Sequence, residues 1–599
     1  MILRTVLFLA SLVLAGTAVW LGLNVFFADG RDGTDYVRIA LLGLTTWWIA
    51  WGAMLGMSGV FMSSRIHRAR TSGPLTTRTA ILLPVYNEPP EKPFSHAAAM
   101  IESLQATGLH GAFELAIVSD TTRAAIGAEE EAWFEKLRGG WGHILPVYYR
   151  RRTDNTGKKA GNIAEFIRRF GGRYDFLIIL DADSLMEGET LVEMVRRMEA
   201  EPKLGLLQTL PKIIRSRSFF GRVLQFSAAF FSPIFTRGVA ALQGREGPFW
   251  GHNAITRTTA FAESCGLPEL KGKPPFGGHI LSHDYVEAAL LARAGWTVRV
   301  DPDIGGSYEE APDNILDYAK RDRRWAQGNL QHSRLLAVPG LKMWSRFVFF
   351  QGIMAYLASS LWGVFLIATI LAPILAAPFE FFPDSALGVP QFPISESTRA
   401  ILLLLLVLGL LLGPKLLIAL RSIFDGRAQQ FGGAFASLAS VIIEILWSSL
   451  IAPLMLAFQT RSVIEILTGA DGGWPVADRE AQAIPLSTAW KASWWITATG
   501  AVILFAAWKF TTLFIWFLPV GGPMLIAPLI IAWSSDSGEG ASARRLRLFM
   551  TPEEQHPRPV MIRQQEILND WRREEIASPG PDSQVTAPPA ATLSTEPTG

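Results

Sequence analysis

Long apolar runs at both ends of the chain are the feature that most limits what it can fold into. Residues 6–27 and 37–62 are each long and apolar enough to cross a bilayer. Five further runs of this kind follow the middle of the chain, at 347–375, 400–421, 434–458, 494–510 and 511–533. This arrangement predicts a membrane protein with a water-soluble domain between two membrane blocks.

The charged residues beside the first two runs predict the orientation of the chain in the membrane. The short link after residue 27 is acidic, whereas the segment after residue 62 carries Arg65, Arg68 and Arg70. Because basic residues beside a span favour its cytoplasmic side, we expect the N-terminus and everything that follows residue 63 to lie in the cytoplasm.

The charges around the second membrane block limit whether the number of spans can be odd or even. The link at 376–399 is acidic, which predicts an outside position, whereas the link at 422–433 and the tail at 542–575 are basic, which predicts the cytoplasm. Seven spans that start inside would end outside and contradict the basic tail. We therefore expect six or eight spans, so that either 434–458 is re-entrant or interfacial, or 431–468 holds two short spans.

Composition and charge divide the chain into four parts. These are two transmembrane helices at 1–66, a cytoplasmic domain at 75–340, a membrane bundle with interfacial segments at 341–535, and a basic cytoplasmic tail at 536–599. The last 22 or so residues are rich in Pro, Ser, Thr and Ala, and we expect disorder there. The net charge of +2 gives no argument for a nucleic-acid partner, and the single cysteine, Cys265, excludes a disulfide framework.

Strands and helices are expected to alternate through the middle of the chain. The expected strands are Thr79–Val85, Phe113–Ser119, Leu145–Tyr149 and 176–180, and the expected helices are 94–106 and Lys158–Phe170. Such alternation predicts a mainly parallel sheet with helices on both faces. The stretch 213–240 mixes phenylalanines with arginines, which predicts a segment that lies on the membrane surface or packs against the membrane block. A buried core helix is the alternative.

The apolar run from Phe176 to Leu180 ends in two carboxylates, Asp181 and Asp183. Open α/β sheets bind ligands at the carboxyl ends of their strands. A hard cation such as Mg²⁺ is commonly held there by one or two carboxylates together with phosphate oxygens. Taken alone, however, the pair is explained more simply by a helix cap and a solvated carboxylate.

Further polar clusters lie at the ends of the expected elements. They are Tyr86-Asn87-Glu88, Asp120, Lys158-Lys159, and Ser282-His283-Asp284 followed by Arg321-Asp322-Arg323-Arg324-Trp325. Lysines at the start of a helix suit a phosphate, although a solvated helix start looks the same. Helix capping explains the His-Asp pair, and anchoring at a membrane interface explains the Arg-Trp pair. The segment Gly251-His252-Asn253 either lines a pocket or forms a tight turn.

Taken together, these motifs resemble a known family. PVYNE, Asp120, KKAGN, DAD, HD and RRW occur in the order found in the processive inverting glycosyltransferases of the cellulose and hyaluronan synthase superfamily. The stretches ILLPVYNE, FWGHNA, SHDYVEAALLARAGW and RDRRWAQGNLQH are most similar to the branch that makes the backbone of osmoregulated periplasmic glucans. The resemblance covers roughly residues 37–570 and implies an α/β domain of the GT-A type inserted between α-helical transmembrane blocks.

The resemblance implies a role for each motif residue. Tyr86, Glu88 and Asp120 would bind the nucleoside of a UDP-sugar, Lys159 and Arg324 its diphosphate, and Asp181 and Asp183 the donor with Mg²⁺ (or Mn²⁺), Asp183 more directly. Asp284 would be the general base, and His283 would share or modulate that role. Trp325 would form the floor of the acceptor site. This sequence departs from the wider superfamily in having Arg321 where Gln is usual and SHD where cellulose synthases have TED.

The resemblance further implies a glucosyltransferase of the bacterial inner membrane with its catalytic domain in the cytoplasm. It would extend a growing glucan chain from UDP-glucose and export the chain, with a periplasmic glucan-processing protein as a further partner. Another processive synthase, such as a cellulose synthase, or a non-processive transferase to a lipid acceptor remains an alternative. A transporter or scaffold that senses nucleotide sugar is an alternative of another class, but the intact set of carboxylates argues against it.

Overall fold

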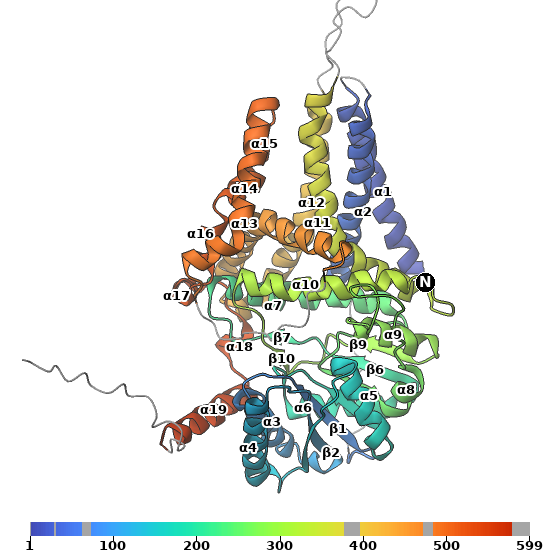
Figure 1. Cartoon of the computed structure of the whole chain (residues 1–599), viewed down its shortest axis with the longest axis vertical. Coiled ribbons are helices and arrows are strands. Elements are labelled where there is room, and N and C mark those ends of the chain that lie inside the picture. The colour runs from blue at the N-terminus through green and yellow to red at the C-terminus, as the bar shows by residue number, and fades with distance from the viewer. Residues whose placement is uncertain (1, 29–30, 63–72, 377–395, 471–482, 578–599) are drawn as a thin grey trace, which may run out of the picture.

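The computed structural model describes residues 2–28, 31–62, 73–376, 396–470 and 483–577. A bundle of long helices stands on an α/β domain, and a layer of roughly horizontal helices separates the two (Figure 1). The arginines expected to set the orientation, Arg65, Arg68 and Arg70, lie outside the described residues. The same holds for most of the acidic link at 376–399 and for the tail from residue 578.

The α/β domain is built on a seven-stranded sheet with the strand order β3-β2-β1-β4-β8-β6-β9. The strands are β1 (Thr79–Val85), β2 (Phe113–Ser119), β3 (Val147–Arg151), β4 (Phe176–Ile179), β6 (Leu204–Gln208), β8 (Ala254–Arg257) and β9 (Thr297–Val300). Only β8 runs antiparallel to its neighbours β4 and β6. The predicted mainly parallel sheet is therefore confirmed.

Helices cover both faces of this sheet because its central strands are apolar on both sides. In β1, Ile81 and Leu83 face a core that includes α3 (Glu91–Gln105) and α6 (Gly188–Ala200). The alternate residues Ala80 and Leu82 face α5 (Lys158–Phe170) and α8 (Thr258–Ser264). A strand buried on both faces consists of consecutive apolar residues, which is why β1 and β4 could be predicted from the sequence.

The order of the strands reverses at β1, which lies between β2 and β4. In register, Val85 pairs with Ser119, and Leu82 pairs with Ile179, so the three strands end at the same edge. Ligands of open α/β sheets bind at such a reversal, outside the carboxyl ends of the strands. A second, three-stranded sheet of β5 (Leu185–Met186), β10 (Ser307–Glu309) and β7 (Lys212–Ile213) also belongs to the domain.

Five helices in the described residues are long and apolar enough to cross a membrane. They are α1 (Ile2–Phe26), α2 (Gly33–Phe61), α11 (Met343–Leu375), α12 (Ser397–Phe424) and α13 (Ala434–Leu467). The number of candidate spans rises to six if the bent pair α15 (Phe514–Leu525) and α16 (Ala527–Ser534) counts as one broken span. The bend between the two helices is 56°. The helix α14 (Leu486–Phe510) packs along α15.

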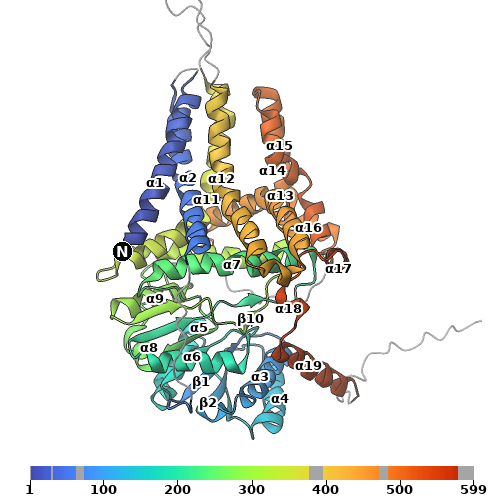
Figure 2. The same ribbon diagram turned by 180° about the vertical axis from the view of Figure 1, so that it is seen from behind.

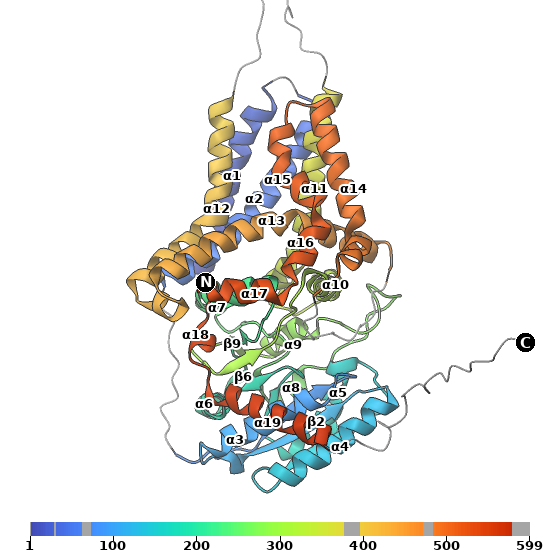
Figure 3. The same cartoon turned by 90° about the vertical axis from the view of Figure 1, so that its left-hand side faces the viewer.

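The expectation that 431–468 holds two short spans is wrong. Residues Ala434–Leu467 form one continuous helix, α13, with Pro453 inside it. Neighbouring helices of a bundle let a proline remain within a helix, so Pro453 does not divide the segment. Figure 3 shows α13 inclined strongly relative to the upright helices α1 and α12, in keeping with the interfacial alternative.

The aromatic stretch at 213–240 forms α7 (Phe219–Gln243), which packs against the underside of the membrane helices (Figure 2). Phe226 and Phe230 are fully buried among residues of α12, α13 and the C-terminal segment. The helix α7 approaches α2 so closely that a Cβ on Gly59 of α2 would lie 1.8 Å from the carbonyl oxygen of Ile234 of α7. Of the two alternatives for this stretch, the structure has the one in which it packs against the membrane block.

The C-terminal segment runs back from the membrane helices onto the α/β domain. It contains α17 (Ser537–Arg545), α18 (Pro552–Gln555) and α19 (Pro559–Ala577). Trp571 of α19 is buried in the main core, with its ring centroid 4.9 Å from that of Trp133 and 5.7 Å from that of Trp141. The described part of the tail is thus folded onto the domain.

Candidate active site

The loop after β1 is fastened to the loop after β2 by Asn87, which has a left-handed backbone (φ 56°). Its side-chain oxygen accepts from the backbone N–H of Thr122 (3.1 Å) and of Arg123 (3.0 Å). Its own backbone N–H donates to Thr121 Oγ1 (2.8 Å). This clasp fixes Tyr86 and Glu88, on either side of Asn87, next to the loop that carries Asp120.

Asp120 is buried and held by α5 and β3 rather than open to solvent. Arg152 Nη2 donates to its Oδ2 (2.8 Å), and Asn162 Nδ2 donates to its Oδ1 (2.8 Å). Burial raises the pKa of Asp120, and the ion pair with Arg152 partly offsets that rise. Arg152 therefore belongs to the site, although its place in the sequence gave no sign of this.

Lys159 connects the end of β4 to the segment before β8. Its ammonium forms an ion pair with Asp181 and donates to the carbonyl oxygen of Gly251 at 2.7 Å. Lys159 and Asn162 both lie on α5, three residues apart, so they project from one face of that helix. One helix thus positions the groups that hold both Asp120 and Asp181.

Asp284 lies on the other side of Gly251, at the start of α9 (His283–Arg293). A Cβ on Gly251, which has a φ of 86°, would stand 3.7 Å from Oδ2 of Asp284. Burial raises the pKa of Asp284, the charge of His283 opposes that rise, and the charge of Glu287 adds to it. The arrangement places a partly buried carboxylate with raised proton affinity close to the Lys159–Asp181 pair.

The loop that leads into α9 is held by the end of α10 (Ile315–Gln331). His332 Nε2 lies 2.9 Å from the carbonyl oxygen of Ser282, and the backbone N–H of Leu281 donates to Gln331 Oε1 at 3.0 Å. The helix that carries Arg324 and Trp325 therefore also sets the position of Asp284.

Glu309, on β10, brings a third carboxylate to Asp181 and Asp183. Burial raises the pKa of Glu309, and the positive charges of His252 and Arg321 oppose that rise. The negative charges of Asp183 and Asp181 add to it. His252 Nε2 lies 3.4 Å from Oε2 of Glu309. The segment Gly251-His252 thus lines the site and does more than form a turn.

The helix α10 presents an aromatic ring next to this cluster. The guanidinium of Arg321 lies 4.7 Å from the ring centroid of Trp325, and 45% of the Trp325 residue surface is exposed. On the same helix, Asp322 is buried and accepts from Gln459 of α13 at 2.8 Å. The helix that carries the arginine-tryptophan motif, α10, lies between β10 and the membrane helices (Figure 1).

The structure brings most of the predicted residues together at one edge of the sheet. Asp181, Lys159, Gly251 and Asp284 form the centre, with Asp183 at the end of β4 and His283 beside Asp284. Glu309, Arg152 and Glu287 were not among the predicted site residues. Of these, only Glu287 could have been predicted from the sequence, because it stands four residues after His283 on an expected helix.

Comparison with known proteins places this site in a known group. The family model described as "Glycosyl transferase family 2" matches residues 80–264, and that described as "Glycosyl transferase family group 2" matches residues 176–414. The chain is 52% identical to the glucans biosynthesis glucosyltransferase H of Cereibacter sphaeroides over 575 residues, which cover 96% of this chain and 95% of that protein.

A second relative and one solved structure extend the comparison. The protein of the same name from Shewanella oneidensis is 42% identical over 589 residues, which cover 97% of this chain and 80% of that protein. A mannosyltransferase from Pyrobaculum calidifontis, solved with GDP-Man and Mn²⁺, is 15% identical with a TM-score of 0.44. That alignment covers 72% of this chain and 99% of the mannosyltransferase.

Proposed function

Because the chain belongs to the glucans biosynthesis glucosyltransferase H family within glycosyltransferase family 2, we propose that it polymerises glucose from UDP-glucose into the backbone of osmoregulated periplasmic glucans. It is a glucosyltransferase of glucan synthesis with helices long enough to span a membrane. The observation that carries the proposal is the arrangement around Gly251, where the Lys159–Asp181 pair meets Asp284.

We assign the proton transfer to Asp284. Direct displacement at an anomeric carbon inverts its configuration and needs a base that takes the proton of the acceptor hydroxyl. Asp284 is partly buried, and the raised pKa makes it a stronger base than an exposed aspartate. His283, held at 3.0 Å from Glu287 Oε2, would stabilise the ionised form of Asp284 before the proton moves.

Departure of UDP leaves negative charge on the β-phosphate, which cationic side chains can offset. Lys159 would serve this purpose, because its ammonium already lies between Asp181 and the carbonyl of Gly251. Arg324, on α10, would add a second positive charge. Trp325 would offer its exposed ring to a sugar of the acceptor, while Tyr86, Glu88 and Asp120 would surround the nucleoside.

The carboxylates after β4 fit a divalent cation that is shared with the donor. The described residues contain no group of three or more His, Cys, Asp or Glu side chains placed to hold an ion on their own. Two carboxylates with phosphate oxygens as the remaining ligands suit Mg²⁺ or Mn²⁺. Asp183 would hold the ion more directly, because Asp181 already pairs with Lys159. When bound, the ion would supply positive charge beside the leaving diphosphate.

We place the catalytic domain at 75–340, in the cytoplasm of a bacterium, between the membrane blocks at 1–66 and 341–535 of the inner membrane. The basic residues on the domain side support this orientation. The growing glucan chain would pass from Trp325 into the adjoining membrane helices and leave toward the periplasm, where a glucan-processing protein would receive it. Asp322 and Gln459 provide polar groups at that junction.

Donor use tests the proposal directly. The full chain in detergent, supplied with Mg²⁺ or Mn²⁺, should release UDP from UDP-glucose and build a glucose polymer that mass spectrometry and NMR can identify. UDP-galactose and GDP-mannose at the same concentration are the controls, and EDTA should abolish release. Binding of UDP-glucose without UDP release would instead favour a nucleotide-sugar sensor, and preferred use of either control donor would contradict the donor assignment.

A further inference from the structure

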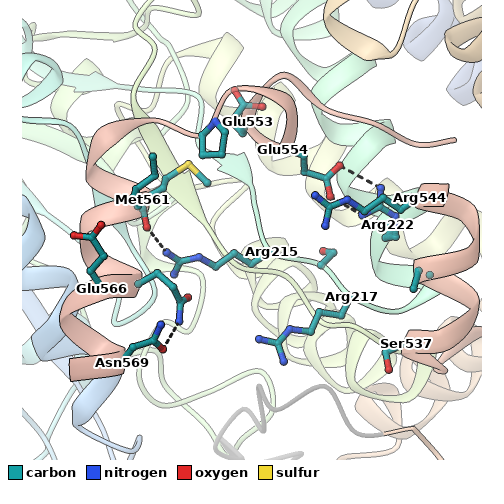
Figure 4. Close-up of a pocket in the computed structure, with 16 residues that line it drawn as sticks. Arg215, Arg217, Arg222, Ser537, Arg544, Glu553, Glu554, Met561, Glu566 and Asn569 are labelled. Carbon is teal, nitrogen blue, oxygen red and sulfur yellow. Dashed lines mark hydrogen bonds and ion pairs between the residues drawn. The ribbon is translucent and has the colours of Figure 1, made fainter. Parts of the chain in front are cut away.

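A second pocket lies apart from the transferase site, between the segment before α7 and the C-terminal helices α17, α18 and α19 (Figure 4). Its volume is about 700 Å³, within the range of small-molecule sites. Four arginines line it: Arg215, Arg217, Arg222 and Arg544. None of the residues assigned to sugar transfer contributes to it.

The carboxylates that line this pocket are already paired with other side chains. The pairs are Glu553 with Lys212 (2.6 Å), Glu554 with Arg222 (2.5 Å) and Glu566 with Arg563 (3.1 Å). Within the described part of the chain, by contrast, the guanidinium groups of Arg217 and Arg544 form no ion pair. Both side chains are exposed, and Figure 4 shows that of Arg217 extending across the pocket. Two guanidinium groups outside any ion pair of the described residues therefore remain at the pocket, with the carboxylate of Asp313 near the guanidinium of Arg217.

An oxyanion offers hydrogen-bond acceptors to the guanidinium groups of Arg217 and Arg544, which are exposed at the pocket. Arginine suits such a ligand because its planar guanidinium can bind a phosphate through two parallel hydrogen bonds.

The backbone at this pocket is strained. Arg215 has a φ of 65°, in the left-handed region that residues other than glycine rarely adopt. Its guanidinium Nη2 donates to the carbonyl oxygen of Met561 on α19 at 3.2 Å, which ties the tail to the pocket. Strain of this kind persists where the surrounding structure enforces it, often at ligand sites.

We propose that this pocket binds a phosphate-bearing ligand, held by Arg217 and Arg544. The pocket lies at the foot of the membrane helices, because α17 starts at Ser537, three residues after α16 ends at Ser534. Figure 3 shows α17 beside α7 at that level. The phosphate can therefore come from a soluble compound or from the headgroup of an anionic lipid.

The test uses the full chain in detergent, with inorganic pyrophosphate as the soluble probe and excess UDP present to occupy the donor site. Isothermal titration should show pyrophosphate binding that Arg217→Ala with Arg544→Ala weakens at least tenfold. Arg545→Ala is the matched control, since Arg545 is the neighbouring exposed arginine of α17 and does not line the pocket. The exposed side chains can be removed without creating a cavity.

The activity of the transferase site serves as a readout of folding for the double variant and for the Arg545→Ala control. Neither changes a residue assigned to sugar transfer.

The lipid source is tested in nanodiscs with and without phosphatidylglycerol. Stabilisation by phosphatidylglycerol that the double variant loses, with no pyrophosphate binding, assigns the site to a lipid headgroup. Pyrophosphate binding in phosphatidylcholine nanodiscs assigns it to a soluble phosphate compound. Equal responses of the double variant and the Arg545→Ala control to both probes, or no response of the wild type to either, would overturn the proposal.

Discussion

The imidazole Nδ1 of His283 lies 3.0 Å from Oε2 of Glu287, one helical turn further along α9. Burial opposes a charge on the imidazole, but the carboxylates of Glu287 and Asp284 together outweigh it, so the pKa of His283 is raised. The pKa of Asp284 is raised by burial, and the positive His283 holds that rise in check. The proposed base is therefore electrostatically coupled to its neighbour in the sequence.

Replacing His283 with glutamine should shift the acidic limb of the pH–rate profile to higher pH. Loss of the imidazolium removes a charge that lowers the pKa of Asp284, so the pKa of that carboxyl rises further. A general base acts in its deprotonated form, hence kcat/KM should rise only at a higher pH. UDP release between pH 5 and 9 measures this. The exposed His143→Gln serves as the control; a limb that stays in place or moves down in pH would refute the coupling.

Replacing Lys159 with methionine should lower kcat/KM for UDP-glucose by about 10²-fold, the usual effect of losing one preorganised donor to a developing oxyanion. The change also leaves Asp181 without its ion-pair partner. Lys159→Arg should restore part of the activity, and Lys158→Met, at the adjacent exposed lysine, should change it by no more than about twofold. Similar losses of activity in the Lys158 and Lys159 variants would show that the charge of Lys159 has no specific role in the reaction.

The buried Glu444 of α13 forms an ion pair with the partly exposed Lys415 of α12, with Nζ 2.7 Å from Oε1. Glu444→Gln alone should destabilise the protein by about 1–3 kcal/mol, because it removes the charged partner of a partly buried lysine. Glu444→Gln combined with Lys415→Met should recover most of that loss. Thermal unfolding in detergent measures both, and an equally unstable double variant would argue that the pair is not the source of the effect.

Trp571→Ala should loosen α19 from the α/β domain. The side chain is buried between Trp133 and Trp141, and truncation of a buried tryptophan costs about 3–5 kcal/mol. Hydrogen exchange of the α19 amides should become much faster, while exchange in β1 stays slow. Ile562→Ala, at an exposed position of the same helix, is the control. Unchanged protection of α19 in the Trp571 variant would contradict the packing.

The sequence predicted β1, β2 and α5 with their observed bounds and β4 to within one residue. The three strands could be predicted because parallel strands buried on both faces are continuous apolar runs. The predicted third strand, Leu145–Tyr149, is displaced by two residues from the observed β3 at Val147–Arg151. β3 is an edge strand whose later residues are partly exposed, so hydrophobicity does not mark where it ends. For 431–468 the parity of the spans left two alternatives open, and the continuous helix α13 excludes the one with two short spans.

The centre of the site could be predicted only as a set of motifs. Tyr86, Asp120 and Asp181 follow strands that are adjacent and parallel, so their proximity follows from the fold class. The contact of Lys159 with Gly251, 92 residues later, depends on how the segment before β8 returns across the sheet, which no local pattern encodes. Glu309 likewise enters the site from the small second sheet.

Asp284→Asn tests the central claim most directly, because it keeps the shape of the side chain and removes only its basicity. UDP release from UDP-glucose in the presence of acceptor should fall by about 10²–10⁴-fold, the usual contribution of a general base. Binding of UDP, measured by titration on the same sample, should remain close to that of the wild type. UDP release by the Asp284→Asn variant at the wild-type rate would contradict the account.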